Sequence, residues 1–398
     1  MKATKLFFLF LITLSSGHAI AQSPAVFLMN PARLVEVKKK LQQHDKAIVQ
    51  LVAGIQKAAD AKLEMKPVSV MDKEFTPASG SKHDYMSQAP YFWYDSTKPN
   101  GLPYMRRDGV RNPEINKITD RGLIGDLESA TRLLSLAWYF TGDEKYAAKS
   151  ADLLRYWFLD NDTRMNPNLD YAQAIPGINT GRGIGIIESR ALTGIADAIG
   201  LLQGSTHWPA KDGKAMQEWY SKYLDWMLTS KNGKEEHAAK NNHGTWFYMQ
   251  VIDFALFIND NGKAKALAEE SKKLIDNQIT GEGKMPLELE RTNGLGYSTF
   301  NLDAWFELAT VAERAGSDIW QYKNGAGAGL FTALKWLQPY AMGEKTWPYQ
   351  QISKYNTHEF YPLLLRAAKK NNDPSFLQDA GKLRGNEKDQ MVELFYGE

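Results

Sequence analysis

Apolar residues recur along this chain at the three- and four-residue spacing of amphipathic helices, beginning near residue 120. Leu133, Leu136, Ala137 and Phe140 form one such stripe, and a Thr-Gly-Asp turn then leads into a second helix through Trp157. The same pattern predicts further helix pairs over 182–204 with 210–230, 245–258 with its return to 279, 297 onward with 325–338, and 356–383. Strand signals are weak throughout, so the pattern predicts an all-α fold of helical hairpins.

The predicted pairs recur roughly every 40 to 55 residues, without clear sequence identity between them. Recurrent helical hairpins build either an open solenoid or a closed (α/α) toroid. The connecting loops vary in length and no repeat consensus is present, which favours the closed toroid with a groove at one end. No low-complexity linker interrupts the chain, so residues 22–398 are predicted to form a single domain.

The N-terminal part differs from the rest. Asn30 followed by Pro31 is typical of a helix start, and we expect one helix from there to about Leu63. Residues 66–120 hold many Pro, Gly, Asp and Tyr residues and show little helical period. Loops of that length are usually functional or disordered. The aromatic content favours an ordered, lid-like segment that crosses one face of the domain.

Residues 1–21 have the pattern of a secretory signal peptide. Lys2 and Lys5 supply the positive start, an apolar run covers 6–14, and Ala19-Ile20-Ala21 is a small-residue cleavage motif. The apolar run is too short to span a bilayer. We therefore expect export across the inner membrane, a mature chain from Gln22 and a periplasmic location, with no membrane helix.

Charge and cysteine content exclude several classes of function. The chain has 48 basic and 46 acidic residues, and the signal peptide holds two of the basic ones and no acid, so the mature chain has 46 of each. This balance argues against nucleic acid as a partner. The absence of Cys excludes disulfides, thiolate metal sites and cysteine nucleophiles. Oligomeric state is left open.

Two polar clusters carry the candidate chemistry. Asn242 and His243 lie just ahead of a predicted helix, and Arg291 precedes Tyr297 downstream. An amide, an imidazole, a guanidinium and a phenol are the groups needed to remove a proton next to a carboxylate. In a uronic acid polymer the C5 hydrogen is adjacent to a carboxylate and O4 is the leaving group. The set therefore indicates β-elimination on an acidic polysaccharide, giving 4,5-unsaturated ends.

The role of each residue leaves alternatives open. Asn242 can hydrogen-bond the carboxylate, and Arg291 can pair with it or lower the pKa of a nearby phenol. His243 is a candidate base or a second neutralising group. Tyr297 is a candidate acid, or a base as phenolate, which requires a nearby cation because the ordinary pKa of tyrosine is about 10. Taken singly, His243 could instead belong to a helix cap, Arg291 to a surface ion pair and Tyr297 to the core.

Further residues are candidates for sugar binding. Aromatic rings can stack on sugar faces, and arginines can pair with neighbouring carboxylates. An alternative is that the loop aromatics only pin the long segment to the toroid. The candidates for substrate binding are Trp93, Tyr94, Arg106, Arg107, Arg182 and Trp246.

The run from Asn241 to His243, with Trp246 three residues later and then Arg291 and Tyr297, resembles the alginate lyase superfamily on α/α toroids. Residues 83–87, 90–93, 101–109 and 179–183 are also similar to that superfamily. The resemblance covers about residues 30–370 and is nearest to polysaccharide lyase family 38, whose members cleave alginate or β-glucuronan. It implies that Asn242 and Arg291 neutralise the carboxylate.

The same resemblance implies that Tyr297 is the acid, and also the base in syn elimination, while His243 assists or acts as base in anti elimination. Gly244 and Thr245 replace the Ser-Tyr pair of classical family 5 enzymes, and the spacing from Arg291 to Tyr297 is one residue shorter. Mannuronate and glucuronate share their configuration at C4 and C5, so the four residues suit either polymer.

Two other classes of function remain as alternatives. A glycoside hydrolase on the same toroid would need two carboxylates flanking the bond. The candidates for those carboxylates are Asp84, Asp126, Glu128, Glu188 and Glu288. A non-catalytic periplasmic protein would bind uronate oligosaccharides without cleaving them. The elimination mechanism requires no cofactor, and no metal-binding motif is present, so neither is expected.

Overall fold

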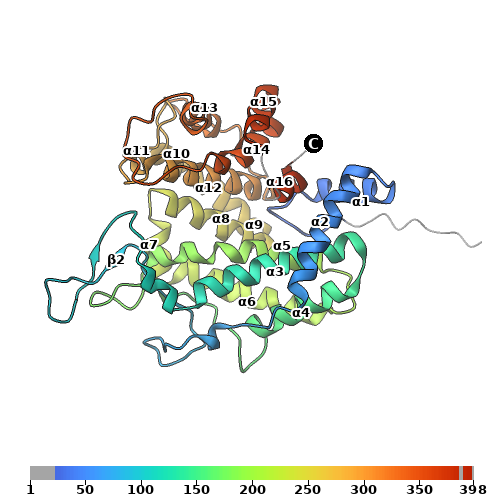
Figure 1. The fold of residues 1–398 in the computed structure, drawn as a ribbon, viewed down its shortest axis with the longest axis horizontal. Coiled ribbons are helices and arrows are strands. Elements are labelled where there is room, and N and C mark those ends of the chain that lie inside the picture. The colour runs from blue at the N-terminus through green and yellow to red at the C-terminus, as the bar shows by residue number, and fades with distance from the viewer. Residues whose placement is uncertain (1–22, 385–388, 397–398) are drawn as a thin grey trace, which may run out of the picture.

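The computed structural model describes residues 23–384 and 389–396 (Figure 1). The predicted signal peptide, residues 1–21, and the predicted mature N-terminus at Gln22 lie outside the described residues. Within the described ranges, none of the helices combines the length and the apolar character that a membrane span requires.

Helices dominate the fold and pack as hairpins around a common centre (Figure 1). Inner helices contact one another in succession, and outer helices pack against α3, α8, α12 and α14. The inner helices are α3 (Asp120–Thr141), α5 (Ala191–Leu201), α8 (Asn242–Phe257), α12 (Gly294–Arg314) and α14 (Tyr361–Asn371). The outer helices are α4 (Glu144–Phe158), α6 (Ala210–Thr229), α9 (Asn261–Ser271), α13 (Leu330–Ala341) and α15 (Pro374–Leu383).

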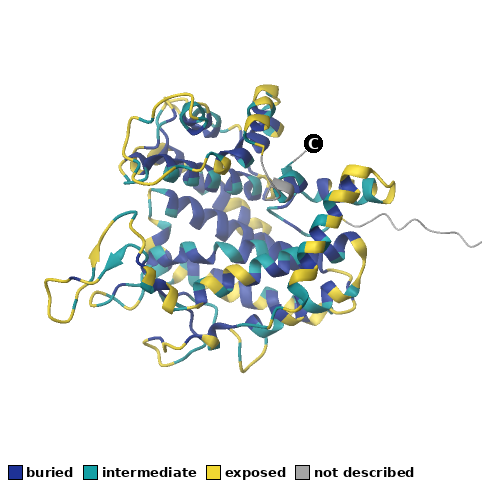
Figure 2. Ribbon diagram, viewed as in Figure 1, coloured by how far each residue is buried: buried dark blue, intermediate teal, exposed yellow. Residues whose placement is uncertain are grey.

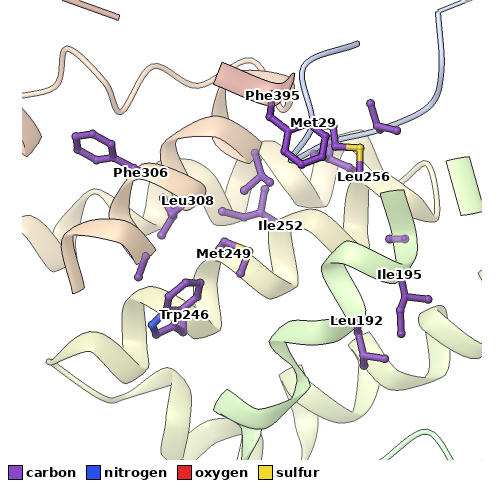
Figure 3. Packing of buried hydrophobic residues seen from close by; sticks show 14 of the residues in the cluster. Met29, Leu192, Ile195, Trp246, Met249, Ile252, Leu256, Phe306, Leu308 and Phe395 are labelled. Atoms are coloured by element: carbon purple, nitrogen blue, oxygen red, sulfur yellow. The ribbon is translucent and has the colours of Figure 1, made fainter. Parts of the chain in front are cut away.

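The ring is closed by the two ends of the described chain. The last helix, α16 (Asp389–Tyr396), packs against both α14 and α1 (Pro31–Gln42), and α1 leads through α2 (Lys46–Leu63) back to α3. Met29 and Phe395 lie together at this closure (Figure 3). The main-chain N–H of Met29 donates to the Asp197 carboxylate of α5 at 2.7 Å. The prediction of a toroid rather than an open solenoid is thus confirmed.

The single helix expected from residue 31 to 63 is wrong, because the chain breaks it into α1 and α2. His44 adopts a left-handed backbone conformation with φ of 57°, which ends the first helix. Asp45 then caps the second by accepting from the N–H groups of Ala47 and Ile48. Asp is a strong N-cap residue, so the sequence does contain a signal for a helix start at Asp45.

The segment 66–120 is ordered, as its aromatic content predicts. It contains two 3₁₀ turns, η1 (Val70–Asp72) and η2 (Pro113–Lys117), and three short strands. Strand β1 (Met86–Gln88) pairs in parallel with β4 (Tyr171–Ala174), and β2 (Phe92–Trp93) pairs with β3 (Met105–Arg106) in a hairpin that projects from the left of Figure 1.

Buried polar contacts anchor this segment to the toroid. The Lys73 ammonium lies 3.0 Å from the carboxylate of Asp120, at the start of α3, and neither side chain is exposed. The Tyr85 hydroxyl donates to Glu188 at 2.9 Å. Because a buried charge is costly without a partner, these contacts strongly favour one position of the segment over others.

Several short elements were not predicted. They are α7 (Lys231–His237) and α11 (Pro286–Leu289), besides α16, while the helix expected to return to 279 is divided into α9 and α10 (Lys273–Gln278). The helix expected from residue 182 begins instead as a 3₁₀ helix, η3 (Gly183–Arg190), before α5. Gly185 lies so close to β4 that an added Cβ would be 2.5 Å from that of Ala172. Close packing at glycine thus distorts this helix start.

Helix α8 runs through the centre of the core (Figure 2). Every residue of α8 except His243 is buried. Figure 3 shows Trp246, Met249, Ile252 and Leu256 of this helix among the core side chains. A helix that is apolar on all sides belongs in the interior, so the partial exposure of His243 at its first turn is the exception that indicates a site.

Candidate active site

A cavity of about 1030 Å³ opens at the N-terminal ends of α8 and α12. Asn242, His243, Arg291 and Tyr297 all line it. The first two begin α8; Arg291 lies between α11 and α12, and Tyr297 is in the first turn of α12. The fold thus brings together two clusters that are about 50 residues apart in the sequence.

Asn242 is fixed by a buried carboxylate. Its main-chain N–H donates to Glu288 at 2.7 Å, and its side-chain Nδ2 lies 3.0 and 2.9 Å from the two Glu288 oxygens. Burial raises the pKa of Glu288, although the hydrogen bonds from Asn242 oppose the shift. A single N–H can make both side-chain contacts, so the second Nδ2 hydrogen remains available to a ligand.

His243 is held by a second buried carboxylate. Its Nδ1 lies 2.7 Å from Oε1 of Glu236, a residue of α7 that is 1% exposed. A carboxylate only accepts hydrogen bonds, so Nδ1 carries the hydrogen in this contact. Nε2 of a neutral imidazole is then left with its lone pair free. This is the tautomer that a base in the cavity requires.

Arg291 is paired with an acid from the long N-terminal segment. Its Nη2 and Nε lie 2.8 and 3.1 Å from the two oxygens of Asp108. Burial alone would raise the pKa of Asp108, but the hydrogen bonds and charge of Arg291 outweigh it and hold that pKa well below its usual range. Within the described chain, Nη1 of Arg291 makes no hydrogen bond, so it is free to meet a substrate carboxylate.

Tyr297 lies between a cation and a second phenol. The Arg291 guanidinium carbon is 3.7 Å from the centre of the Tyr297 ring, and the Tyr297 hydroxyl donates to the hydroxyl of Tyr91 at 2.9 Å. Burial, followed by the hydrogen bond with Tyr91, raises the pKa of Tyr297 above its ordinary value, although Arg291 opposes this shift. Tyr297 is therefore a neutral phenol at neutral pH, the form in which it can donate a proton.

The predicted substrate-binding residues divide into two groups. Arg106, Arg182 and Trp246 line the cavity. Arg106 is ion-paired with Asp108, Arg182 donates to Gln173, and Trp246 is buried in the wall with only 3% exposure.

The other three, Trp93, Tyr94 and Arg107, belong to the projecting hairpin and are not part of the cavity wall. The indole of Trp93 donates to the carbonyl of Val110 at 2.9 Å, with the Arg107 guanidinium over its ring at 5.3 Å. Tyr94 is half-exposed. In this conformation Trp93 and Arg107 stabilise the hairpin itself.

Four partners of the predicted residues were not assigned to the lyase site from the sequence. They are Tyr91, Asp108, Glu236 and Glu288. Asp108 lies 183 positions from its partner, and Glu288 lies 46 positions from its own. Nothing in the local pattern distinguishes them from other acids. Only Glu236, seven residues before His243, follows a short-range spacing, and it lies on a helix that was not predicted.

Comparisons with known proteins identify the family and the fold. The alginate lyase family matches residues 69–347, more than half of the chain. The crystal structure of an alginate lyase from Bacteroides ovatus is 39% identical, with a TM-score of 0.89, over 94% of this chain and 99% of that one.

More distant structures share the fold. Alginate lyase A1-III from Sphingomonas species A1 has a TM-score of 0.54 at 15% identity, over 85% of this chain and 93% of that one. A histidine-to-alanine form of alginate lyase A1-III, complexed with a tetrasaccharide, has a TM-score of 0.58 at 16% identity, over 90% of this chain and 91% of that one. No curated protein sequence matches the chain. The family match, with the toroid that accompanies it, means that this chain belongs to the alginate lyase family.

Proposed function

We propose that the protein is a polysaccharide lyase that cleaves a 1,4-linked uronic acid polymer, alginate foremost, by β-elimination. The observation that carries this proposal is the lining of one cavity by Asn242, His243, Arg291 and Tyr297. Each of the four has a polar partner that restricts its position, and each retains a group that can act on a ligand. The 39% identical relative is itself an alginate lyase.

The first requirement of elimination is to stabilise the charge that develops when C5 loses its proton. The free Nη1 of Arg291 and the second Nδ2 hydrogen of Asn242 supply donors for the substrate carboxylate. Donors fixed in advance within a cavity stabilise such an enolate-like intermediate more than mobile water does. Glu288 and Asp108 contribute indirectly, because they hold these two donors in place.

Proton transfer requires a base for C5 and an acid for O4. Tyr297 enters the reaction as a neutral phenol and donates to O4. When C5–H faces the imidazole, Nε2 of His243 takes the proton. When the uronate has the opposite configuration at C5, that hydrogen faces the phenol, and Tyr297 has to act first as base. The second route needs the phenolate, which burial and Tyr91 disfavour, so it is expected to be the slower one.

A hydrolytic mechanism is less compatible with the acids of this site. Glu288 is occupied by Asn242, Glu188 accepts from Tyr85 and Ser87, and Asp84 accepts from two asparagine side chains. Glu128 is paired with Arg132 at 3.0 Å, and Asp126 is not part of the cavity wall. A hydrolase needs one acid with a free proton and one free carboxylate across the bond. None of these five acids supplies such a pair near Tyr297.

The decisive experiment is an ultraviolet assay against polymannuronate, polyguluronate, β-glucuronan and a neutral glucan. Elimination leaves an absorbing C4–C5 double bond, whereas hydrolysis leaves none. We expect absorbance to rise with at least one uronate polymer and not with glucan. New reducing ends without absorbance would identify a hydrolase. Binding without either product would identify a carbohydrate-binding protein. The same assay ranks alginate against glucuronan.

The finer assignment to polysaccharide lyase family 38 and the periplasmic location both remain proposals. Fractionation of the source cells, with detection of the mature N-terminus, tests the second. We expect cleavage after Ala21, and a retained N-terminus in the cytoplasmic fraction would contradict it.

A further inference from the structure

The cavity continues inward well past the four catalytic candidates. Along α12 it is lined by Tyr297, Phe300, Asp303 and Glu307. These residues lie on one face of the helix, and ten residues of α-helix rise about 15 Å. Residues of α3 from Arg121 to Arg132 line it over a similar length. We call the deeper part, lined by Glu128, Arg132, Arg190, Asp303, Glu307 and Arg366, the inner chamber.

Most of the charges in the inner chamber are paired with one another. Arg132 lies 3.0 Å from Glu128. Arg366 lies 3.2 Å from Asp303 and 3.8 Å from Glu307. Arg190 is different, because its guanidinium makes no hydrogen bond or ion pair with any residue of the described ranges. A cation that is largely removed from water without an anionic partner is costly, which suggests that a ligand supplies the partner.

The position of Arg190 relates it to the catalytic candidates. Its guanidinium carbon lies 4.7 Å from the ring centre of Trp246 and 5.0 Å from that of Phe300. Trp246 is one helical turn beyond His243 on α8, and Phe300 is one turn beyond Tyr297 on α12. The guanidinium is therefore held about one helical turn, or 5.4 Å, deeper than the imidazole and the phenol.

The stacking also suits an anion receptor. A guanidinium packed by its faces against aromatic rings keeps its N–H groups in the ring plane, where they can bind a carboxylate with two parallel hydrogen bonds. Of the nearby acids, Glu307 competes weakly. Burial, followed by the charge of Asp303, raises the pKa of Glu307 to about 7, so this side chain is partly neutral at neutral pH.

We propose that Arg190 binds the carboxylate of a second uronate residue, the one adjacent to the residue undergoing elimination, so that the substrate chain extends into the inner chamber. This inference rests on the proposed function, and it assigns a binding role, not a catalytic one. One helical turn is close to the length of a sugar unit, so one chain can reach both positions.

The test is calorimetric titration of the full-length protein with a β-1,4-linked mannuronate trisaccharide. Tyr297→Phe serves as the background, so that the probe is not consumed, and Arg190→Met is added to remove the charge while keeping an apolar side chain against the two rings. We expect the affinity to fall by about tenfold to a hundredfold, the loss expected for a hydrogen bond to a charged group. Arg190→Lys should lose less, because it keeps the charge.

Two controls make the result specific. Neutral β-1,4-mannotriose carries no carboxylate, so its weak binding should be the same with and without Arg190→Met. Arg155→Met removes an arginine that lies over Trp208 at 5.9 Å and outside the cavity wall, and it should leave trisaccharide affinity unchanged. Thermal melting of each variant separates loss of binding from loss of the fold.

Equal affinity of the mannuronate trisaccharide for the Arg190→Met and Arg190 proteins would overturn the proposal. The proposal would also be overturned if Arg190→Met lowered the affinity for mannotriose as much as the affinity for the mannuronate trisaccharide. If Arg190→Met does not fold, Arg190→Lys decides the question. Unchanged trisaccharide affinity of Arg190→Lys in the Tyr297→Phe background, together with an unchanged KM when Tyr297 is present, would exclude directed carboxylate pairing. Unsaturated products from the unsubstituted protein are measured separately, so their absence would refute the proposed function without bearing on anion binding.

Discussion

The start of α8 and the start of α12 each supply half of the proposed site, yet they are supported by different parts of the chain. Asn242 and His243 are held by Glu288 and Glu236, which belong to the short helices α11 and α7 of the toroid itself. Arg291 and Tyr297 are held by Asp108 and Tyr91, which belong to the segment 66–120.

Only the α12 half depends on the long segment. The α8 half is complete once the toroid has formed. The α12 half is completed only when segment 66–120 lies across the cavity. Changes in that segment should therefore affect the acid, Tyr297, and leave the base, His243, in place.

The largest effect is expected from Tyr297→Phe, which removes the proton donor of the α12 half. We expect kcat to fall by about 10³- to 10⁴-fold, the upper part of the range for general acid–base catalysis. Oligosaccharide binding should survive, because the ring and its stacking on Arg291 remain. The check is the ultraviolet assay with binding measured in parallel. Turnover at the unsubstituted rate would exclude Tyr297 as the acid.

Glu236→Gln tests the α8 half. A glutamine amide can donate to Nδ1 of His243, which allows the tautomer with hydrogen on Nε2 and removes the free lone pair. We expect kcat to fall by about 10²-fold, close to the effect of His243→Ala. Both substitutions should slow the cleavage of one C5 epimer, mannuronate or guluronate, more than that of the other.

The matched control for this test is Glu235→Gln. Glu235 is the exposed neighbour on α7 and accepts from the N–H of Gly183. It should retain full activity. If the Glu236→Gln variant is as active as the unsubstituted protein on both polymers, the histidine does not depend on its buried partner.

Asp108→Asn tests the dependence of the α12 half on the long segment. The substitution removes the charge that fixes Arg291, so we expect kcat/KM to fall by about tenfold, the scale of one hydrogen bond to a charged group. Asp95→Asn is the control, because Asp95 lies in the same hairpin and accepts from Thr97. Steady-state kinetics check both. A similar loss in the two variants would mean that the hairpin acts only as a whole.

The smallest change is expected from Tyr91→Phe. It removes the hydrogen bond that helps to raise the pKa of Tyr297, so that pKa should fall. A residue that must be protonated loses activity as the pH rises through its pKa, so the alkaline limb of the rate profile should move to lower pH. At neutral pH the rate should change by only about threefold, as for one neutral hydrogen bond. An alkaline limb at the same pH would show that Tyr91 does not influence the acid.

The sequence predicted the hairpin order and the toroid because apolar spacing on α3, α8 and α12 is a local property. It also singled out Asn242, His243, Arg291 and Tyr297 as candidates, since helix starts with unusual polar groups are visible in the pattern. It could not reveal the contact between Asp108 and Arg291, which depends on how residues 66–120 cross the toroid. The extra helices α7 and α11 are too short to show a period.

The aromatic residues illustrate the same limit. Trp93, Tyr94 and Trp246 were grouped as sugar platforms by residue type alone. The structure gives Trp246 a place in the cavity wall and Trp93 a contact within the hairpin. Which face of a ring meets solvent is decided by packing across the whole fold, so composition cannot separate these cases.

Closure of the ring by α16 has a consequence for biosynthesis. Hairpins from α2 to α15 can pair as a nascent chain emerges, because their partners are neighbours in sequence. The wall formed by Met29 and Phe395 cannot, since it joins the earliest and latest described segments to be translated. Closure of the ring therefore requires an encounter between these two segments, and a chain truncated before α16 should remain an open arc with its apolar rim uncovered.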